Sequence, residues 1–247
     1  MAAAAAATAG TALYLDGKYG IRKDLRGLRI QRNTMRMYME AGEFSIPLNS
    51  NNCPINYLSV KRNRVSLYYF FEESVKRKPN DECIWSRDGC YTWQQTYDRV
   101  HQFAQWFLQQ GVQPGDLVSF YLTNSAEFLM AWLGLWAIGA APAMINYHLA
   151  GKALLHCLKV SGAKLVLVDE DKDVVARIED ERANIEAQLG MNILVLDAGT
   201  KEDVRAMKAE RPGDEFRKGV KGDWPMSIFY TRSVNNQSLL IVDPMLI

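Results

Sequence analysis

The middle of the chain alternates three short β-rich runs with two apolar helical runs, and this stretch constrains the fold more than any other. Strands are expected at Leu117–Leu122, Ala143–Ile145 and Leu165–Val168, and helices at Ala126–Ile138 and Lys152–Val160. Each helix is long enough to return the chain, so consecutive strands should run parallel. Strands covered on both faces are nearly uninterrupted hydrophobic runs, as these are. The sequence therefore predicts an α/β fold with a mostly parallel sheet and flanking helices.

Turn residues and helix caps extend this pattern toward the N-terminus. A helix from Ser66 should end before Pro79, because its apolar residues fall at helical spacing. Cys83–Ser86 and Cys90–Thr92 should form a hairpin around an Asp-Gly turn. Thr92 then suits the N-cap of the next helix, which a glycine ends. Pro142 is expected to bound the second strand of the central unit.

The pattern continues on the C-terminal side of the unit. A helix is expected at Lys172–Leu189, capped by Asp171, and a strand at Asn192–Leu196. The polar segment 199–222 should hold a short helix and a surface loop, with its charges on a solvated face. Met226–Tyr230 is expected to form one more short strand, after which the sequence changes character.

A basic arm precedes the globular part. Residues 13–42 place apolar side chains near one helical face and basic ones, including Arg22, Arg26 and Arg29, largely elsewhere. Such a helix can lie on an anionic membrane surface, and it can equally pack on the main domain. The alanine run that opens the chain is either a frayed tail or a weak membrane anchor. Residues 43–63 are expected to form a linker, and the globular body to begin near Val65.

Composition excludes several functional classes. The 29 Lys and Arg residues nearly balance the 28 Asp and Glu residues, so a net charge of +1 does not favour nucleic acid. The four Cys and three His residues are scattered, which predicts reduced thiols and no metal site. The longest apolar run, 128–144, falls short of the ~20 residues that a membrane-spanning helix needs and contains Pro142. This run is expected to be a buried helix and strand.

Common catalytic and nucleotide-binding motifs are missing from the sequence. Thr123-Asn124-Ser125 follows the first strand where a dinucleotide fingerprint would need glycines, and no Walker phosphate loop or G-x-S-x-G elbow occurs. The carboxylates in 169–173 fit a turn and the first turn of a helix better than an acid/base pair. The residues alone thus indicate an α/β domain with room for a ligand.

Several runs of the sequence resemble those of a known protein family. An aromatic-Thr-Trp opening at 91–93, the run GVQPGDLV at 111–118 and a later Gly-Ala pair resemble the N-terminal part of the adenylate-forming, AMP-binding synthetases over most of residues 64–231. The run INYHLAGKALLHCLKVSGAK at 145–164 resembles, within them, the branch of fatty acid transport proteins and very-long-chain acyl-CoA synthetases. The residues that carry this narrower resemblance are Asn146, Leu149, Leu154, Leu155, His156, Cys157, Ala163 and Lys164.

The resemblance implies an ATP-dependent fatty acid–CoA ligase. A fatty acid would be activated on Mg-bound ATP as an acyl-adenylate and then passed to coenzyme A. It also implies an intracellular location, with membrane association at the endoplasmic reticulum, a peroxisome or a lipid droplet. The phosphate loop of the family begins Tyr-Thr-Ser-Gly-Thr-Thr-Gly, and Tyr230 and Thr231 match its entry. Phe128 and Trp132 could line an acyl path, although aromatics on a buried helix are more often core residues.

The match then ends, because Arg232–Asn236 replace the glycines and threonines of the loop. We expect an arm at 1–63, a truncated synthetase domain with a partly complete sheet at 64–231, and an unrelated tail at 232–247. The chain is accordingly expected to be inactive, with no catalytic residue of its own. One alternative is a non-catalytic protein that binds a membrane surface or a partner; another is an unstable by-product whose incomplete sheet exposes an edge.

Overall fold

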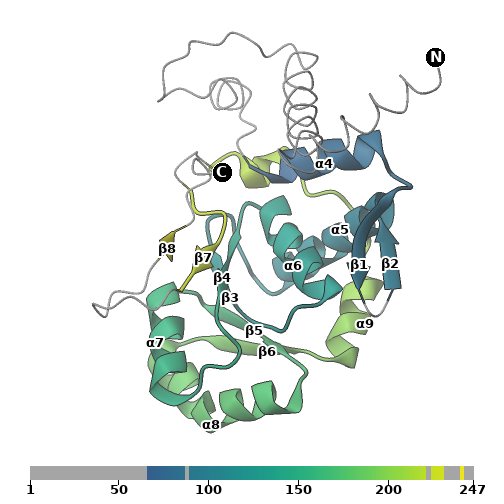
Figure 1. Cartoon of the computed structure of the whole chain (residues 1–247). Coiled ribbons are helices and arrows are strands. Elements are labelled where there is room, and N and C mark those ends of the chain that lie inside the picture. The colour runs from purple at the N-terminus through teal and green to yellow at the C-terminus, as the bar shows by residue number, and fades with distance from the viewer. Residues whose placement is uncertain (1–65, 87–88, 221–223, 231–239, 242–247) are drawn as a thin grey trace, which may run out of the picture. The chain divides into compact units, whose positions relative to one another are not determined.

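The computed structural model describes residues 66–86, 89–220, 224–230 and 240–241. The predicted basic helix and the linker lie outside these residues. A six-stranded sheet occupies the middle of the molecule in the order β6-β5-β3-β4-β7-β8 (Figure 1). Its strands are β3 (Leu117–Tyr121), β4 (Ala141–Met144), β5 (Leu165–Asp169), β6 (Asn192–Leu196), β7 (Ile228–Phe229) and β8 (Leu240–Ile241).

Helices connect the parallel strands, as the alternation in the sequence predicts. The chain passes from β3 to β4 through α6, from β4 to β5 through α7, and from β5 to β6 through α8. The first five strands in the sheet order are parallel, which confirms the predicted α/β fold, and β8 pairs antiparallel with β7. The connecting helices are α6 (Ala126–Ala137), α7 (Gly151–Ser161) and α8 (Lys172–Leu189).

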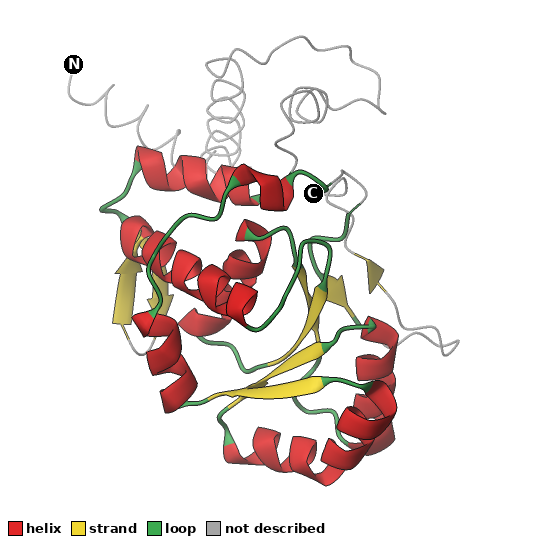
Figure 2. Ribbon diagram, turned by 180° about the vertical axis from the view of Figure 1, so that it is seen from behind, coloured by secondary structure: helices red, strands yellow, loops and turns green. Residues whose placement is uncertain are grey.

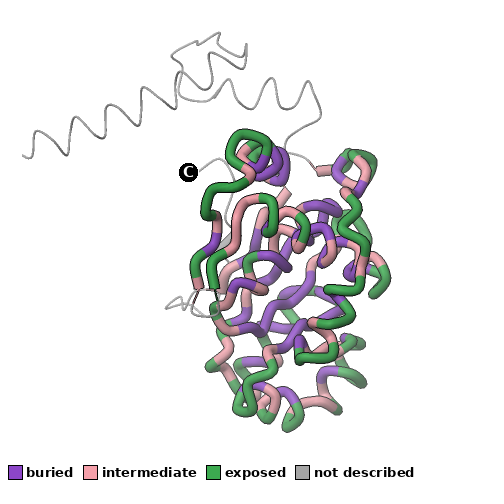
Figure 3. Tube along the Cα trace, turned by 90° about the vertical axis from the view of Figure 1, so that its right-hand side faces the viewer, coloured by how far each residue is buried: buried purple, intermediate pink, exposed green. Residues whose placement is uncertain are grey.

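The sheet separates two hydrophobic cores, because side chains alternate between its faces. In β3, Phe120 belongs to the core beneath α5 and α6, whereas Tyr121 belongs to the core beneath α7 and α8. In β5, Leu167 and Val168 divide in the same way. The helical layers on the two sides of the strands are visible in Figure 2, and the buried interior between them in Figure 3.

The remaining elements lie around the first core. Thr92 caps α5 as predicted, since its hydroxyl accepts from Gln95 N and the Gln95 side chain accepts from Thr92 N. The predicted hairpin is also confirmed: β1 and β2 pair antiparallel and form a separate two-stranded sheet. These elements are α4 (Tyr68–Arg77), β1 (Glu82–Ser86), β2 (Gly89–Thr92), α5 (Trp93–Gln109), α9 (Ala198–Ala206) and the 3₁₀ helix η1 (Asp214–Arg217).

Pro142 lies inside β4 and does not bound it, so the predicted start of this strand is wrong. Its neighbour Ala141 donates its N–H to Asp116 on the β3 side of the strand. Successive residues point their N–H groups to opposite sides, so the missing N–H of Pro142 falls on the β7 side. Pairing with β7 begins only at Ala143, and the Ser227 hydroxyl donates to the Pro142 carbonyl. The proline therefore costs the sheet no hydrogen bond.

The segment 199–222 differs from the predicted solvated face. It contains the expected short helix α9, but the Arg217 side chain is fully buried. Two carbonyls, Ala137 O and Pro212 O, accept from its guanidinium, as does the Asp214 carboxylate at 2.8 Å. The guanidinium also lies 4.4 Å from the centre of the Tyr68 ring. A buried arginine is tolerated here because partners surround most of its donors.

Candidate functional site

The predicted entry to a phosphate loop lies at the end of β7, beside β4. Strand β7 is shorter than the predicted Met226–Tyr230, and side-chain hydrogen bonds stand in for strand pairing just before it. The indole N–H of Trp136 donates to the Met226 carbonyl at 2.8 Å, and the Ser227 hydroxyl donates to the Pro142 carbonyl of β4. The register places Ile228 opposite Ala143 and Phe229 opposite Met144. The chain leaves the sheet at Tyr230, at the carboxyl end of the parallel strands.

Tyr230 turns its side chain into the second core. The ring packs with the cluster beneath α7, and its hydroxyl is buried without a hydrogen-bond partner among the described residues. Burial raises the pKa of Tyr230 to about 12; the Cys157 thiol adds to the rise, and the Ser161 hydroxyl opposes it. The polar atom of Tyr230 is therefore withdrawn from the edge of the sheet, where a phosphate would lie.

The loop that follows β4 is held in place next to this exit. The Asn146 side chain accepts from His148 N at 2.9 Å, and the rings of Tyr147 and His148 lie 4.2 Å apart. Arg177 on α8 donates to the Tyr147 carbonyl at 2.8 Å. The Tyr121 hydroxyl donates to the carbonyl of Leu149. Side chains from β3 and α8 thus fix one wall of the candidate site.

The residues of the narrower resemblance divide between core and surface. On α7, Leu154 and Cys157 are buried and His156 is exposed. Ala163 is buried just before β5, and Lys164 is exposed and lies 4.0 Å from the Asp116 carboxylate. Burial raises the pKa of the Cys157 thiol, which makes it a poor nucleophile at neutral pH.

The carboxylates at the end of β5 act in local structure, as predicted. Asp169 accepts from the backbone N–H and the hydroxyl of Thr123, at 2.9 and 2.6 Å. Asp171 caps α8 by accepting from Asp173 N and Val174 N. The Asp169 bonds join the carboxyl ends of β3 and β5, and the Asp171 bonds cap α8, so both carboxylates have a structural role.

Phe128 and Trp132 belong to a row of aromatic rings along α6. Phe128 lies 6.0 Å from Trp132, which lies 5.5 Å from Trp136 and 6.2 Å from Phe229 on β7. All four are half-buried, and the three on α6 pack against the first core. Edge-to-face packing of this kind holds β7 against α6.

A buried polar network beside α4 was not anticipated from the sequence. Glu72 accepts from Arg211 and, at 3.1 Å, from the Tyr97 hydroxyl. Arg211 also pairs with Asp214 at 2.7 Å. One sequence signal points to it, since Glu72 falls four residues after Tyr68 on the apolar face of a helix, where a charge needs a partner.

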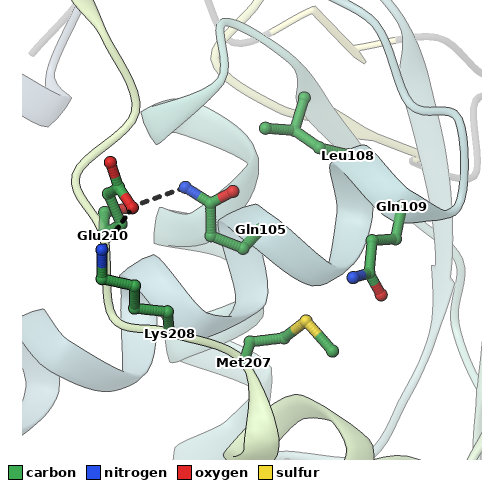
Figure 4. A pocket seen from close by; sticks show the side chains of 6 residues that line it. All are labelled: Gln105, Leu108, Gln109, Met207, Lys208 and Glu210. Carbon is green, nitrogen blue, oxygen red and sulfur yellow. Dashed lines mark hydrogen bonds and ion pairs between the residues drawn. The ribbon is translucent and has the colours of Figure 1, made fainter.

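A separate hollow of about 380 Å³ lies between α5 and the segment after α9 (Figure 4). Gln105 Nε2 donates to the Glu210 carbonyl at 2.8 Å across it. Lys208 pairs with the carboxylate of Glu210 at 3.0 Å, so the charges at its rim are already balanced. Its lining residues are Gln105, Leu108, Gln109, Met207, Lys208 and Glu210.

The described residues do not by themselves fit a triphosphate with its metal. The Tyr230 hydroxyl is buried, and no group of three or more His, Cys, Asp or Glu side chains in the described ranges could hold a metal ion. Thr231, the second matched loop position, lies outside the described residues, as do Arg22, Arg26 and Arg29. In the same part of the chain, no helix is both long and apolar enough to span a bilayer.

Comparisons with known proteins place this fold. Residues 71–231 match the AMP-binding enzyme family. Isopenicillin N epimerase component 1 of Hapsidospora chrysogena is 35% identical over 181 residues, which are 73% of this chain and 27% of that protein. The very long-chain fatty acid transport protein of Cochliobolus heterostrophus is 32% identical over 192 residues, which are 77% of this chain and 27% of that protein.

Solved structures agree on the fold. A fatty acyl CoA synthetase of Mycobacterium tuberculosis superposes with a TM-score of 0.61 at 21% identity, covering 68% of this chain and 33% of that one. The chain spans about a quarter of the length of the curated relatives reported above. It therefore belongs to the AMP-binding enzyme family and carries the N-terminal part of that fold, with very long-chain fatty acid transport proteins among its relatives.

Proposed function

We propose that this chain is the N-terminal part of an ATP-dependent fatty acid–CoA ligase and that, as a 247-residue polypeptide, it does not catalyse the reaction. The ligase chemistry has two steps: a fatty acid carboxylate attacks the α-phosphate of Mg-bound ATP and releases pyrophosphate, and the coenzyme A thiol then displaces AMP. Support for the ligase comes from the family match and from the fatty acid transport proteins and the fatty acyl CoA synthetase among the relatives.

One observation carries the proposed inactivity. The family match ends at Thr231, directly after β7, and Arg232–Asn236 stand where the family has Ser-Gly-Thr-Thr-Gly. Small residues let a backbone approach phosphate oxygens closely with its N–H groups, and replacing the glycines of such a loop removes that freedom. The side-chain hydroxyl of Tyr230 is buried beneath α7. In this proposal the chain supplies strand β7, from whose end a phosphate loop would extend.

Five substitutions test the proposal: Arg232→Ser, Ser233→Gly, Val234→Thr, Asn235→Thr and Asn236→Gly, made together. The restored loop is expected to bind ATP at least about tenfold more tightly than the original chain, measured by calorimetry with Mg-ATP. A variant with the same five new residues in scrambled order is the matched control. The original chain should form no acyl-CoA from palmitate, ATP and coenzyme A, assayed by mass spectrometry.

The outcomes separate the two parts of the proposal. Acyl-CoA formation by the original chain would contradict the inactivity and leave the ligase assignment standing. A restored variant that binds ATP no better than the scrambled control would contradict the view that β7 supports a phosphate loop.

A second candidate function rests on the distribution of charge. Residues 1–63 hold nine Lys and Arg against four Asp and Glu, although the whole chain carries only +1. The remainder is therefore acidic overall. We propose that the arm, through Arg22, Arg26 and Arg29, binds an anionic membrane surface inside the cell, since each such residue contributes about 1 kcal/mol near anionic lipid. This role does not require catalysis.

A further inference from the structure

The outer edge of β7 is covered by residues from much later in the sequence. Strand β8 pairs antiparallel with β7, with Ile228 opposite Ile241 and Phe229 opposite Leu240. The other four pairings of this sheet are parallel. Residues 240 and 241 lie beyond position 231, where the family match ends. The strand that borders β7 on this side thus comes from a segment outside the match to the family.

The β7 edge is suited to bind an extended strand. Its inner side pairs with β4, and its outer side would present backbone N–H and C=O groups if β8 were absent. Ile228 is buried, Phe229 packs on Trp132, and neither Met226 nor Ser227 carries a charge. Charged side chains are a common device against unwanted pairing at sheet edges, and this edge has none between 226 and 230.

The chain connectivity favours pairing within one molecule. Nine residues separate Tyr230 from Leu240 in the sequence. The entropy cost of closing a loop rises only slowly with its length, and joining two segments in one chain makes their pairing an intramolecular event. A second copy of the chain at micromolar concentration would compete poorly with such a segment.

We propose that the outer edge of β7 is an interaction surface for an extended antiparallel strand, and that residues 240–241 occupy it in cis and thereby keep it from pairing with a second copy of this chain. The surface is the β7 backbone flanked by apolar side chains, and its partner chemistry is an uncharged strand. The proposal is independent of ATP binding and of membrane binding.

Proline substitutions in β8 test the proposal, because proline lacks an N–H and fits a paired strand only where that N–H would face away from the partner strand. Leu240→Pro is the test variant, and Asn235→Pro, in the connection, is the matched control. In Leu240→Pro, amide exchange in a peptide covering 224–230 is expected to accelerate about tenfold, as the loss of one or two net hydrogen bonds implies. Exchange in β6, at the opposite edge of the sheet, should not change in either variant.

Association is the second readout. Leu240→Pro should form dimers or larger species, measured by light scattering after gel filtration, at a concentration where the original chain and Asn235→Pro keep the mass of one chain. A synthetic peptide of residues 238–246 should bind the edge of Leu240→Pro, reduce the association and restore slow exchange at 224–230.

A further test uses only the original chain, so it does not depend on whether a variant folds. Its exchange at 224–230 should be slow and independent of protein concentration. Protection that falls on dilution would mean that β8 comes from a second copy, and fast exchange at every concentration would mean that the edge is open. Either result overturns the proposal, as does equal exchange and equal mass in the original chain and a folded Leu240→Pro.

Discussion

At the scale of single residues, the structure shows how the energetic cost of burying a charged arginine is offset. Arg217 is buried completely, and its guanidinium is compensated by two carbonyls, Asp214 and the Tyr68 ring. Its Nε has no partner among the described residues. Leaving a buried charge without its partners costs several kcal/mol. Loss of Asp214 would remove one ion-pair partner from both Arg217 and Arg211, and should therefore lower the stability of the fold.

His101, next to this network, should make stability depend on pH. It is buried, and its Nε2 lies 2.7 Å from the Tyr68 hydroxyl. Burial lowers its pKa to about 4 from the ordinary 6.5; Arg211 and Arg217 add to the fall, and Glu72 opposes it. The unfolded chain therefore binds a proton first as the pH falls. The free energy of unfolding should decrease from about pH 6.5 to about pH 4, by on the order of 3 kcal/mol.

Urea denaturation between pH 7 and pH 4.5 measures this decrease. His101→Gln removes the titrating group and keeps a side chain that can accept from Tyr68, so its stability should vary less over the same range. The carboxylates of Glu72 and Asp214 have lowered pKa values and lose their contribution only at lower pH. Equal pH dependence in both proteins would show that His101 does not cause it.

At the scale of elements, the helix N-caps were predicted correctly, because capping depends on neighbouring residues alone. Thr92 and Asp171 cap their helices, and Gly190 ends α8 in the left-handed conformation. The boundary of β4 could not be predicted, because whether Pro142 is tolerated depends on when β7 joins the sheet. Whether a proline is tolerated in a strand depends on hydrogen bonds between segments far apart in the sequence, and no local sequence pattern predicts these bonds.

Gly139, after α6, allows a close approach that should not tolerate a side chain. Its φ is +72°, and a Cβ there would overlap the Phe216 carbonyl. Gly139→Ala should lower the free energy of unfolding by about 3 kcal/mol or more, because left-handed strain and the overlap add. Gly190→Ala is the matched control: its φ is +63° with nothing within 4 Å of the added Cβ, so only about 1 kcal/mol should be lost. Equal losses in denaturation would mean that the Phe216 contact is unimportant.

At the scale of the whole molecule, the sequence predicted the parallel α/β fold and the family, and the structure added the arrangement. Hydrophobic runs fix which segments are strands, but the order β6-β5-β3-β4-β7 depends on packing between helices far apart in the sequence. The same limit applies to the candidate site. The match to a loop identified Tyr230, whereas the burial of its hydroxyl beneath α7 depends on the packing of segments far apart in the sequence.

The charge difference between the arm and the rest of the chain gives a prediction at this scale. The full chain should float with vesicles of phosphatidylcholine and phosphatidylserine, and Arg22→Ala, Arg26→Ala and Arg29→Ala together should reduce binding by at least about tenfold. Arg77→Ala, Arg205→Ala and Lys208→Ala together remove the same charge from exposed positions of the body and should have little effect. Equal losses would indicate a nonspecific charge effect and contradict a role for the arm.

The separation of two cores by one sheet also bears on how such a chain evolves. Neighbours such as Leu167 and Val168 belong to different cores. A change in side-chain volume at Leu167 affects packing against α5 and α6, and a change at Val168 affects packing against α7 and α8. The effects of substitutions on opposite faces on the free energy of unfolding should therefore be additive. Lineages can therefore remodel the helices on one face while the other keeps its packing, which lets a shared scaffold diverge one side at a time.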